Sequence, residues 1–269
     1  MDPRMGGSAP GVRPVEPWRL TVRLALLTGG SRGLGRALCC HLEAHGYRVI
    51  EFSRSAPHAF SSQLDLRSPP TLGAVAESIS SIDPAACEEL VVISNAGTLA
   101  PIGPAWGHDR QHVFQNLNVN LVSAIGFIGE VVRHFRGCRA RKLIINVSSG
   151  AALKGYAGWS LYCAAKAGME NFIRAVAVEE QRQECPFLPI SVDPGVIDTD
   201  MQALIRESSA SDFPDVERFR SRKESGGLAE PDAVARAIIA LAARHDLKPG
   251  ARYEVESLSA TCLAEQWPE

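Results

Sequence analysis

Apolar and polar residues follow two different periods along this chain, and the two periods take turns. Short runs rich in Val, Ile, Leu and Phe predict buried strands, and they alternate with segments whose apolar residues recur every three to four positions, as in amphipathic helices. The expected strands cover residues 20–27, 47–53, 63–66, 90–94, 143–147, 188–192 and 250–255. The expected helices cover residues 35–45, 69–83, 110–134, 162–183 and 230–244. This alternation predicts an α/β fold, a doubly wound seven-stranded parallel sheet with helices on both faces.

The same pattern predicts where the domain begins and ends. Residues 1–19 are rich in Gly and Pro, so we expect a flexible N-terminal tail, and residues 257–269 form a C-terminal tail. The segment 201–227 is polar, charged and irregular, and we interpret it as a mobile substrate loop or lid, or else as a surface insertion. A single domain therefore spans residues 20–256.

Composition narrows the classes of function. The 269 residues are 45% hydrophobic and 22% charged, which suits one domain with a full core. The net charge of −2 offers no basic excess for a nucleic acid or an anionic membrane, and no apolar run reaches the ~20 residues that span a bilayer. The seven cysteines are scattered without a CxxC pair, and the N-terminus lacks the apolar stretch of a signal peptide. We therefore expect a cytoplasmic protein with reduced thiols.

A glycine-rich turn joins the first predicted strand to the first predicted helix. It reads TGGSRGLG over residues 28–35, a TGxxxGxG spacing. Glycines let the backbone approach a pyrophosphate, and the helix N-terminus favours its negative charge. Because the turn follows a strand and opens a helix, it predicts a dinucleotide site more firmly than an isolated glycine-rich loop would.

The end of the second strand indicates which dinucleotide binds. An acidic residue there would bind the ribose 2′-hydroxyl of NAD, but this chain has Ser53 and Arg54 at that point, with Arg32 in the glycine-rich turn. Two arginines suit a 2′-phosphate, which favours NADP(H) over NAD(H). Glu51 lies two residues too early, inside the strand. The alternative is that both arginines are simply solvated.

Small and polar residues follow other predicted strands. Asp65 is placed to accept a hydrogen bond from an adenine amino group, and the residues of Asn95-Ala96-Gly97 are small enough for a cofactor ring to lie against the backbone. Asn120 brings an amide near the sheet, where a hydrogen-bonded structural Asn is the ordinary interpretation.

The most informative chemistry lies at the end of the strand 143–147. Ser149 follows this strand, and Tyr162 and Lys166 lie one helical turn apart in the next helix. A phenol titrates near ~10, and a neighbouring ammonium favours the phenolate, so we expect a lowered pKa for Tyr162 and proton exchange near neutral pH. The alternative is one aromatic residue and one lysine on an ordinary helix.

Other catalytic motifs are incomplete. His41 and His45 lie one helical turn apart, but the acid between them is misplaced for the HExxH pattern of zinc proteases, so we expect no metal site. Residues 158–162 lack the second glycine of the GxSxG turn of serine hydrolases. Cys163 has no histidine near it in the sequence and is interpreted as a packing residue.

Taken together, these motifs resemble the short-chain dehydrogenase/reductase family over residues 20–256. The matching elements are TGGSRGLG at 28–35, Asp65-Leu66, Asn95-Ala96-Gly97, Asn120, Ser149, Tyr162-x-x-x-Lys166 and Pro194-Gly195. One departure is Ser94, where the family pattern has a second Asn. The resemblance implies a Rossmann fold and hydride transfer between NADP(H) and a carbonyl group.

The resemblance also implies a role for each site residue. Tyr162 would donate the proton to the carbonyl, or act as the base in oxidation, and Lys166 would bind the nicotinamide ribose and lower the tyrosine pKa. Ser149 would hold the carbonyl oxygen, and Asn120 would support a proton-relay water. The implied cofactor-binding set is Gly29, Ser31, Arg32, Gly33, Leu34, Gly35, Ser53, Arg54, Asp65, Leu66, Asn95, Ala96, Gly97, Tyr162, Lys166, Pro194, Gly195, Val196 and Thr199.

Within the family, residues 161–166, 194–202 and 250–254 are similar to those of sepiapterin reductases and the related bacterial benzil reductases. Glu254 matches the position at which sepiapterin reductases carry a pterin-anchoring Asp, and the alternative is a solvated residue near the chain end. We therefore expect an NADPH-dependent reductase of a ketone or 1,2-dicarbonyl. The candidate substrate residues are Ser149, Trp159, Met201 and Glu254.

Other functions remain open on the same fold. One is a non-catalytic NADP-binding redox sensor, which has no need of the Ser, Tyr and Lys set, and another is an alcohol dehydrogenase of this family with an unrelated substrate. Sugar epimerases and dehydratases usually show TGxxGxxG and a longer substrate domain, which this chain lacks. Family likeness also implies a homodimer or homotetramer packed through residues 110–134 and 162–183.

Overall fold

The computed structural model describes residues 22–68 and 71–255, which form one sheet with helices on both faces. The strands are β1 (Val22–Thr28), β2 (Arg48–Ser53), β3 (Ser61–Gln63), β4 (Cys87–Ser94), β5 (Arg141–Val147), β6 (Phe187–Asp193) and β7 (Arg252–Glu254). They pair in parallel in the order β3-β2-β1-β4-β5-β6-β7. The strand order reverses direction at β1, so a crevice for a ligand opens at the carboxyl ends of the strands.

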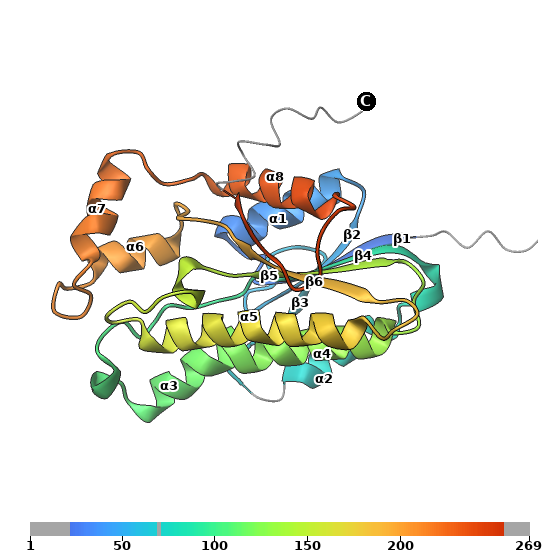
Figure 1. Ribbon diagram of the computed structural model, residues 1–269, viewed down its shortest axis with the longest axis horizontal. Helices are drawn as coiled ribbons and strands as arrows, with labels where there is room; N and C mark the ends of the chain where they lie inside the picture. The colour runs from blue at the N-terminus through green and yellow to red at the C-terminus, as the bar shows by residue number, and fades with distance from the viewer. Residues whose placement is uncertain (1–21, 69–70, 256–269) are drawn as a thin grey trace, which may run out of the picture.

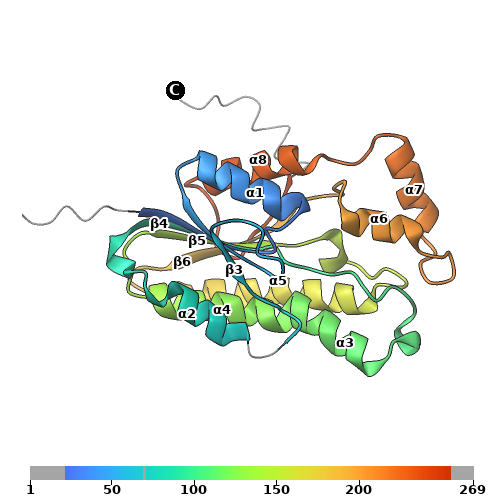
Figure 2. The ribbon, with the colours of Figure 1, turned by 180° about the vertical axis from the view of Figure 1, so that it is seen from behind.

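Two layers of helices cover the sheet. On one face α1 (Gly33–Ala44) packs beside α8 (Pro231–Ala242), and on the other lie α2 (Thr71–Ser80), α4 (Ser123–Phe135) and α5 (Ser160–Glu180), as Figure 1 and the reverse view in Figure 2 show. This architecture confirms the predicted doubly wound parallel sheet.

The apolar alternation within β1 explains why the sheet is buried on both faces. Ala25 and Leu27 belong to the core under α1 and α8, whereas Leu24 and Leu26 belong to the core on the opposite face. None of the four is more than 1% exposed. Since successive side chains of a strand point to opposite faces, a strand covered on both sides needs apolar residues at every position.

The segment 201–227 is helical, and the expectation of an irregular loop was wrong. It contains most of α6 (Asp200–Glu207) and all of α7 (Val216–Glu224), drawn in orange in Figure 1. Phe213, Val216 and Phe219 are buried and pack with Trp159 in a third apolar cluster. The polar composition of the segment hid this three-residue spacing of apolar side chains, which anchors α7.

The third predicted strand was placed too late in the chain. The observed β3 is Ser61–Gln63, and the buried Leu64 and Leu66 follow it in irregular backbone. Both leucines lie in the core beside β2 without extending the strand. Their alternation with polar residues is the pattern of a strand, and it misplaced the prediction. The other elements agree with the predictions to within a few residues at their ends. The predicted tails, residues 1–19 and 257–269, lie outside the described residues.

Candidate active site

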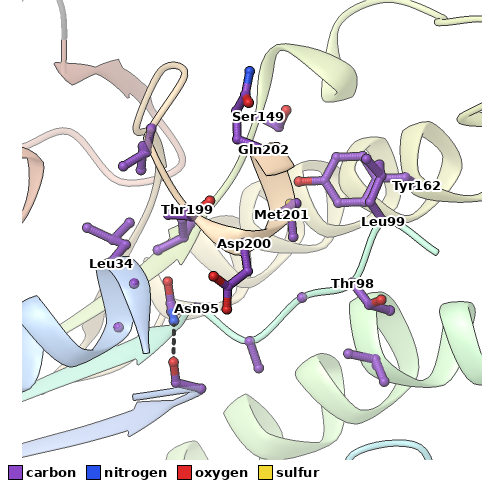
Figure 3. Close-up of a pocket in the computed structure, with 18 of the residues that line it drawn as sticks. Leu34, Asn95, Thr98, Leu99, Ser149, Tyr162, Thr199, Asp200, Met201 and Gln202 are labelled. Carbon is purple, nitrogen blue, oxygen red and sulfur yellow. Dashed lines mark hydrogen bonds between the residues drawn. The ribbon is translucent and has the colours of Figure 1, made fainter. Parts of the chain in front are cut away.

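A cavity of about 1870 Å³ follows the carboxyl ends of the strands. All of the predicted site residues except Asn120 line it, so the structure brings together positions that span most of the described chain. Figure 3 shows Tyr162 from α5, Ser149 from the loop after β5, Thr199 just before α6 and Met201 in its first turn around this space. The cavity therefore extends from the glycine-rich turn to Tyr162.

The glycine-rich turn forms one end of the cavity. Gly29 has a φ of +75°, and a Cβ added to it would lie 2.7 Å from the Cα of Ala96. A Cβ on Gly35 would lie 2.0 Å from the carbonyl oxygen of Gly29. Asn95 holds the turn from below, because its Nδ2 donates to that same oxygen at 2.9 Å, and a hydrogen bond from Asn95 is drawn in Figure 3. Only glycine fits this cradle, which lies at the N-terminus of α1 and suits a pyrophosphate.

The strand end beside this cradle presents a cation and hides its acid. Glu51 is fully buried and accepts hydrogen bonds from the Gly30 amide at 2.8 Å and from Ser61 Oγ at 2.5 Å. Ser53 Oγ also donates to this carboxylate, at 3.1 Å. Arg54 is exposed and lines the cavity. Because Glu51 points into the protein, its carboxylate does not compete for the ribose end of a cofactor.

Arg67 is a cavity residue that the sequence did not reveal. Its guanidinium pairs with Asp65 at 2.6 Å, and the hydrogen bond from Arg67 holds the pKa of Asp65 below its ordinary value. Both side chains line the cavity. An acid followed two residues later by an arginine is too common in sequences to have signalled this pair.

Arg32 forms an ion pair across the cleft. Its Nη1 lies 2.7 Å from Oδ2 of Asp200, the first residue of α6, and both side chains are largely exposed. The glycine-rich turn is therefore joined to the helix that carries Met201. Exposed ion pairs contribute about 0–1 kcal/mol, so this contact is easily exchanged for another anion.

Ser149, Tyr162 and Lys166 converge at the other end of the cavity. The Lys166 ammonium donates to the Val147 carbonyl at 2.7 Å and lies 5.5 Å from the centroid of the Tyr162 ring. Ser149 Oγ accepts a hydrogen bond from the Ala151 amide at 3.2 Å, which begins a short helical turn. Tyr162 and Lys166 are both buried, and a hydrogen bond with Ser149 acts on the phenol.

The expected lowering of the Tyr162 pKa was wrong for the protein chain by itself. Burial raises the pKa of Tyr162 to about 12, and the hydrogen bond with Ser149 offsets only part of that rise. Burial also lowers the pKa of Lys166 to about 8, with Asp193 and Glu170 acting in the opposite direction. The sequence showed that a phenol and an ammonium are neighbours, but it did not show that both leave water. At neutral pH the phenol therefore keeps its proton.

The buried ammonium makes a testable contribution to stability. Because the folded protein holds Lys166 at a pKa of about 8 against an ordinary value of 10.5, folding below pH 8 carries a cost that fades as pH rises towards 10.5. We expect Lys166→Met to raise the free energy of unfolding at pH 7 by about 2 kcal/mol, after allowing for the lost hydrogen bond to Val147. Urea unfolding at pH 7 and pH 10 measures it, and a gain of equal size at both pH values would contradict it.

A π-helical turn, Asn118–Val122, interrupts the helix predicted over residues 110–134, between α3 (Arg110–Leu117) and α4. Asn120 is buried there and forms two hydrogen bonds with the Thr98 backbone. Its Oδ1 accepts from the Thr98 amide at 2.9 Å, and its Nδ2 donates to the Thr98 carbonyl at 2.8 Å. A further hydrogen bond runs from Asn120 Nδ2 to Asn116 Oδ1 at 3.0 Å. The side chain is thus satisfied and fixes Thr98, which lines the cavity. Such turns inside helices frequently mark functional sites.

Aromatic rings form the wall next to Tyr162. Trp159 stacks on Phe213 with 4.5 Å between ring centroids and meets the Tyr162 ring edge-on at 6.3 Å. Met201 lines the cavity from α6, and Glu254 lines it from the end of β7, with its side chain 57% exposed. The cavity lining therefore includes an aromatic ring that packing holds beside Tyr162, and Glu254 adds a carboxylate to it.

Two kinds of site are not found in the part of the chain that the structure describes. Within residues 22–68 and 71–255, no three His, Cys, Asp or Glu side chains gather closely enough to hold a metal ion. None of the described helices is long and apolar enough to cross a membrane. The described cysteines are free thiols.

Comparison with known proteins adds a family to this geometry. The family model described as short chain dehydrogenase matches residues 23–210. A benzil reductase ((S)-benzoin forming) from Bacillus cereus is 35% identical over 230 residues, covering 81% of this chain and 92% of that relative. A sepiapterin reductase from Xenopus tropicalis is 27% identical over 250 residues, covering 84% and 94% respectively.

A solved structure agrees with these sequence relatives. The crystal structure of the KRED1-Pglu enzyme superposes with a TM-score of 0.74 at 28% sequence identity, covering 86% of this chain and all of that one. This similarity supports the assignment of the fold, since it extends over most of this chain.

Proposed function

This chain belongs to the short chain dehydrogenase family, and from that premise we propose that it is an NADPH-dependent reductase of ketones or 1,2-dicarbonyl compounds. The family assignment makes it an oxidoreductase, and relatives that carry a name are carbonyl reductases. One observation carries the proposal. Ser149, Tyr162 and Lys166 line the same cavity as the glycine-rich turn, so a proton donor and a dinucleotide site share one space.

The residues present suit a nicotinamide dinucleotide. We assign the pyrophosphate to the glycine cradle at the start of α1, the adenine to Asp65 and Leu66, and the 2′-phosphate to Ser53, Arg54 and Arg32. The inward-facing Glu51 supports a 2′-phosphate at this end, since no free acid opposes it. The remaining positions of the proposed cofactor site are Asn95, Ala96, Gly97, Pro194, Gly195, Val196 and Thr199.

The chain's own residues would move the proton. When bound, the nicotinamide supplies the hydride. Tyr162, protonated at neutral pH, donates its hydroxyl proton to the carbonyl oxygen, and Ser149 holds that oxygen with a hydrogen bond. The Lys166 ammonium then stabilises the phenolate, because an adjacent opposite charge favours the ionised form. Asn120 supports this arrangement by fixing Thr98 and the backbone that leads to it.

The raised pKa of Tyr162 favours the reductive direction. A phenol with a pKa of about 12 keeps its proton at physiological pH, so it is ready to give one and poorly prepared to take one. The alkoxide that forms on hydride addition is a stronger base than the phenolate, and the proton therefore moves to the product. Loss of the Lys166 charge above pH 8 would slow the reaction.

The aromatic wall supports a flat, bulky dicarbonyl as the substrate. We expect the purified protein to consume NADPH rapidly with benzil, because Trp159 offers a flat apolar ring beside Tyr162. Sepiapterin is tested side by side, and we expect Glu254→Gln to weaken kcat/KM for sepiapterin by about tenfold relative to benzil if the carboxylate anchors the pterin. Absorbance at the NADPH band follows both reactions.

The outcomes of this assay separate the substrate classes. Turnover of benzil alone means a general diketone reductase in which Glu254 has no anchoring role. Turnover of sepiapterin with the expected effect of Glu254→Gln means a pterin reductase. If neither compound reacts, the assignment to these two groups of reductases is refuted, while membership of the family stands.

We further propose that residues 20–256 act as one catalytic domain, that α6 and α7 cover the substrate, and that the protein is a cytoplasmic homodimer or homotetramer packed through α4 and α5. Val122, in the π-helical turn before α4, and Val178, near the end of α5, are 54% and 59% exposed, and we expect such an assembly to cover them. The free thiols support a reducing compartment.

A further inference from the structure

Arg252, on the last strand of the sheet, lies at the centre of a buried charge cluster behind the Ser149 loop. Its guanidinium forms an ion pair with Glu170 of α5, and its Nη2 lies 2.5 Å from Oδ2 of Asp193 at the end of β6. Glu254 Oε1 is 3.5 Å from the Arg252 Nε. The side chain of Arg252 is 15% exposed and that of Glu170 is 3% exposed. Arg252 therefore balances two poorly hydrated carboxylates, those of Glu170 and Asp193, together with the exposed carboxylate of Glu254.

The same cluster holds the backbone on which Ser149 lies. Each of three successive residues, from the last residue of β5 to Ser149, forms a hydrogen bond with a charged side chain. Lys166 bonds the Val147 carbonyl at 2.7 Å, Glu170 accepts from Ser148 Oγ at 2.5 Å, and Arg252 Nη1 is 3.4 Å from the Ser149 carbonyl. Lys166 and Glu170 lie one turn apart on α5, so this helix provides two of the hydrogen-bond partners and β7 provides the third.

The charges of the cluster act on the proton-transfer pair. Asp193 raises the pKa of both Tyr162 and Lys166, and Glu170 raises that of Lys166. Arg252 opposes them, since it lowers the pKa of Asp193 against the larger effect of burial. Arg174 lies 3.6 Å from Glu170 on α5, and its side chain is 53% exposed, so its charge is better screened than that of Arg252. Three further titratable groups face this region: Cys163 raises the pKa of Tyr162, Glu254 raises that of Asp193, and Tyr156 lines the cavity.

We propose that Arg252 is a positioning residue for the carbonyl reduction, which fixes the Ser149 backbone and balances the charges of Glu170 and Asp193 beside Lys166. This inference rests on the proposed function and assigns a role in it to a residue that does not line the cavity. A purely structural arginine would hold β7 against β6 and leave the ionisation of Lys166 and Tyr162 unchanged, so the two roles differ in a measurable way.

The first test replaces the charge and keeps a similar volume. In Arg252→Met we expect kcat with NADPH and benzil to fall about tenfold or more, while the Kd for NADPH, measured by fluorescence titration, changes less than about threefold. We also expect the alkaline limb of the kcat–pH profile to move up by about one unit, because two buried carboxylates lose their counter-charge and favour the Lys166 ammonium. Arg252→Lys keeps the charge but loses the planar guanidinium with its paired donors. We therefore expect the alkaline limb to stay in place in this variant while kcat still falls.

The second test removes a carboxylate instead of the arginine. Asp193→Asn is isosteric and should move the alkaline limb down, opposite to Arg252→Met, and the double variant should return it towards its original place. A limb that stays where it is in Arg252→Met and in Asp193→Asn overturns the inference, even if kcat falls in both. Should Arg252→Met fail to fold, the Asp193→Asn profile decides the matter alone.

A measurement without catalysis separates this inference from the proposed function. The pH window over which urea stability rises reports Lys166 directly, because it begins at the folded pKa of about 8. We expect this window to start at higher pH in Arg252→Met and at lower pH in Asp193→Asn. If the wild-type protein reduces no carbonyl, the proposed function fails, yet the shifted windows would still support the charge-balancing role. Unshifted windows would refute it.

Discussion

Replacing Tyr162 by phenylalanine is expected to lower kcat for carbonyl reduction by at least about a thousandfold, the range of a lost general acid in a positioned site. The substitution removes only the phenol oxygen, and the ring keeps its edge-on contact with Trp159 at 6.3 Å and its burial. No other hydroxyl on α5 lines the cavity to replace it. Initial rates with saturating NADPH and benzil measure the loss.

Two controls make this result specific. Fluorescence titration should give a Kd for NADPH within about threefold of the wild-type value, because we expect the hydroxyl to act in the transition state and to contribute little to the binding of the cofactor. Tyr156→Phe removes a second phenol that lines the same cavity, and we expect it to retain activity within about fivefold. Near-normal turnover in Tyr162→Phe would refute the assignment of the proton donor.

The same pair of proteins tests the non-catalytic alternative. A redox sensor would bind NADPH tightly in both the wild-type and the Tyr162→Phe protein and reduce no carbonyl in either. The buried ammonium of Lys166 is hard to explain for such a protein, because burial lowers its pKa to about 8 and so opposes its charge. A costly buried charge beside a phenol is typical of a site that moves protons.

Local patterns of the sequence were enough to predict the sheet and to name residues that line one cavity. Leu24 to Leu27 are apolar at every position because β1 is covered on both faces, so the strand is visible in the sequence without any knowledge of its partners. Tyr162 and Lys166 are close in space because they are one turn apart on α5. The cradle of Gly29 and Gly35 follows from one turn between a strand and a helix.

Contacts between distant parts of the chain were not visible in this way. Arg252 meets Glu170 and Asp193 from 82 and 59 positions away, and Arg32 meets Asp200 from 168. Each of these residues looks like an ordinary surface charge in the sequence. The predicted direction of the Tyr162 pKa shift was wrong for the same reason. Burial of the phenol depends on α6, α7 and the aromatic rings that pack around it.

Replacing Arg54 by alanine is expected to raise the Kd for NADPH by about 10- to 100-fold and that for NADH by less than about threefold, since a charge-assisted hydrogen bond contributes about 1.5–3 kcal/mol. Arg54 is exposed at the end of β2, next to Ser53, where the proposed 2′-phosphate site lies. Fluorescence titrations with both cofactors, at one fixed ionic strength, measure the ratio.

Arg67 is the matched control for Arg54. It lines the same end of the cavity, but its guanidinium is paired with Asp65 at 2.6 Å, so Arg67→Ala should change the two Kd values by similar factors. Arg32→Ala should fall between the two, because Arg32 must exchange its 2.7 Å contact with Asp200 before it can hold a phosphate. If Arg54→Ala weakens NADPH and NADH equally, the 2′-phosphate assignment is refuted. In that case the cation at the end of β2 would contribute only general attraction to the cofactor's phosphates, and NAD(H) would become as good a candidate as NADP(H).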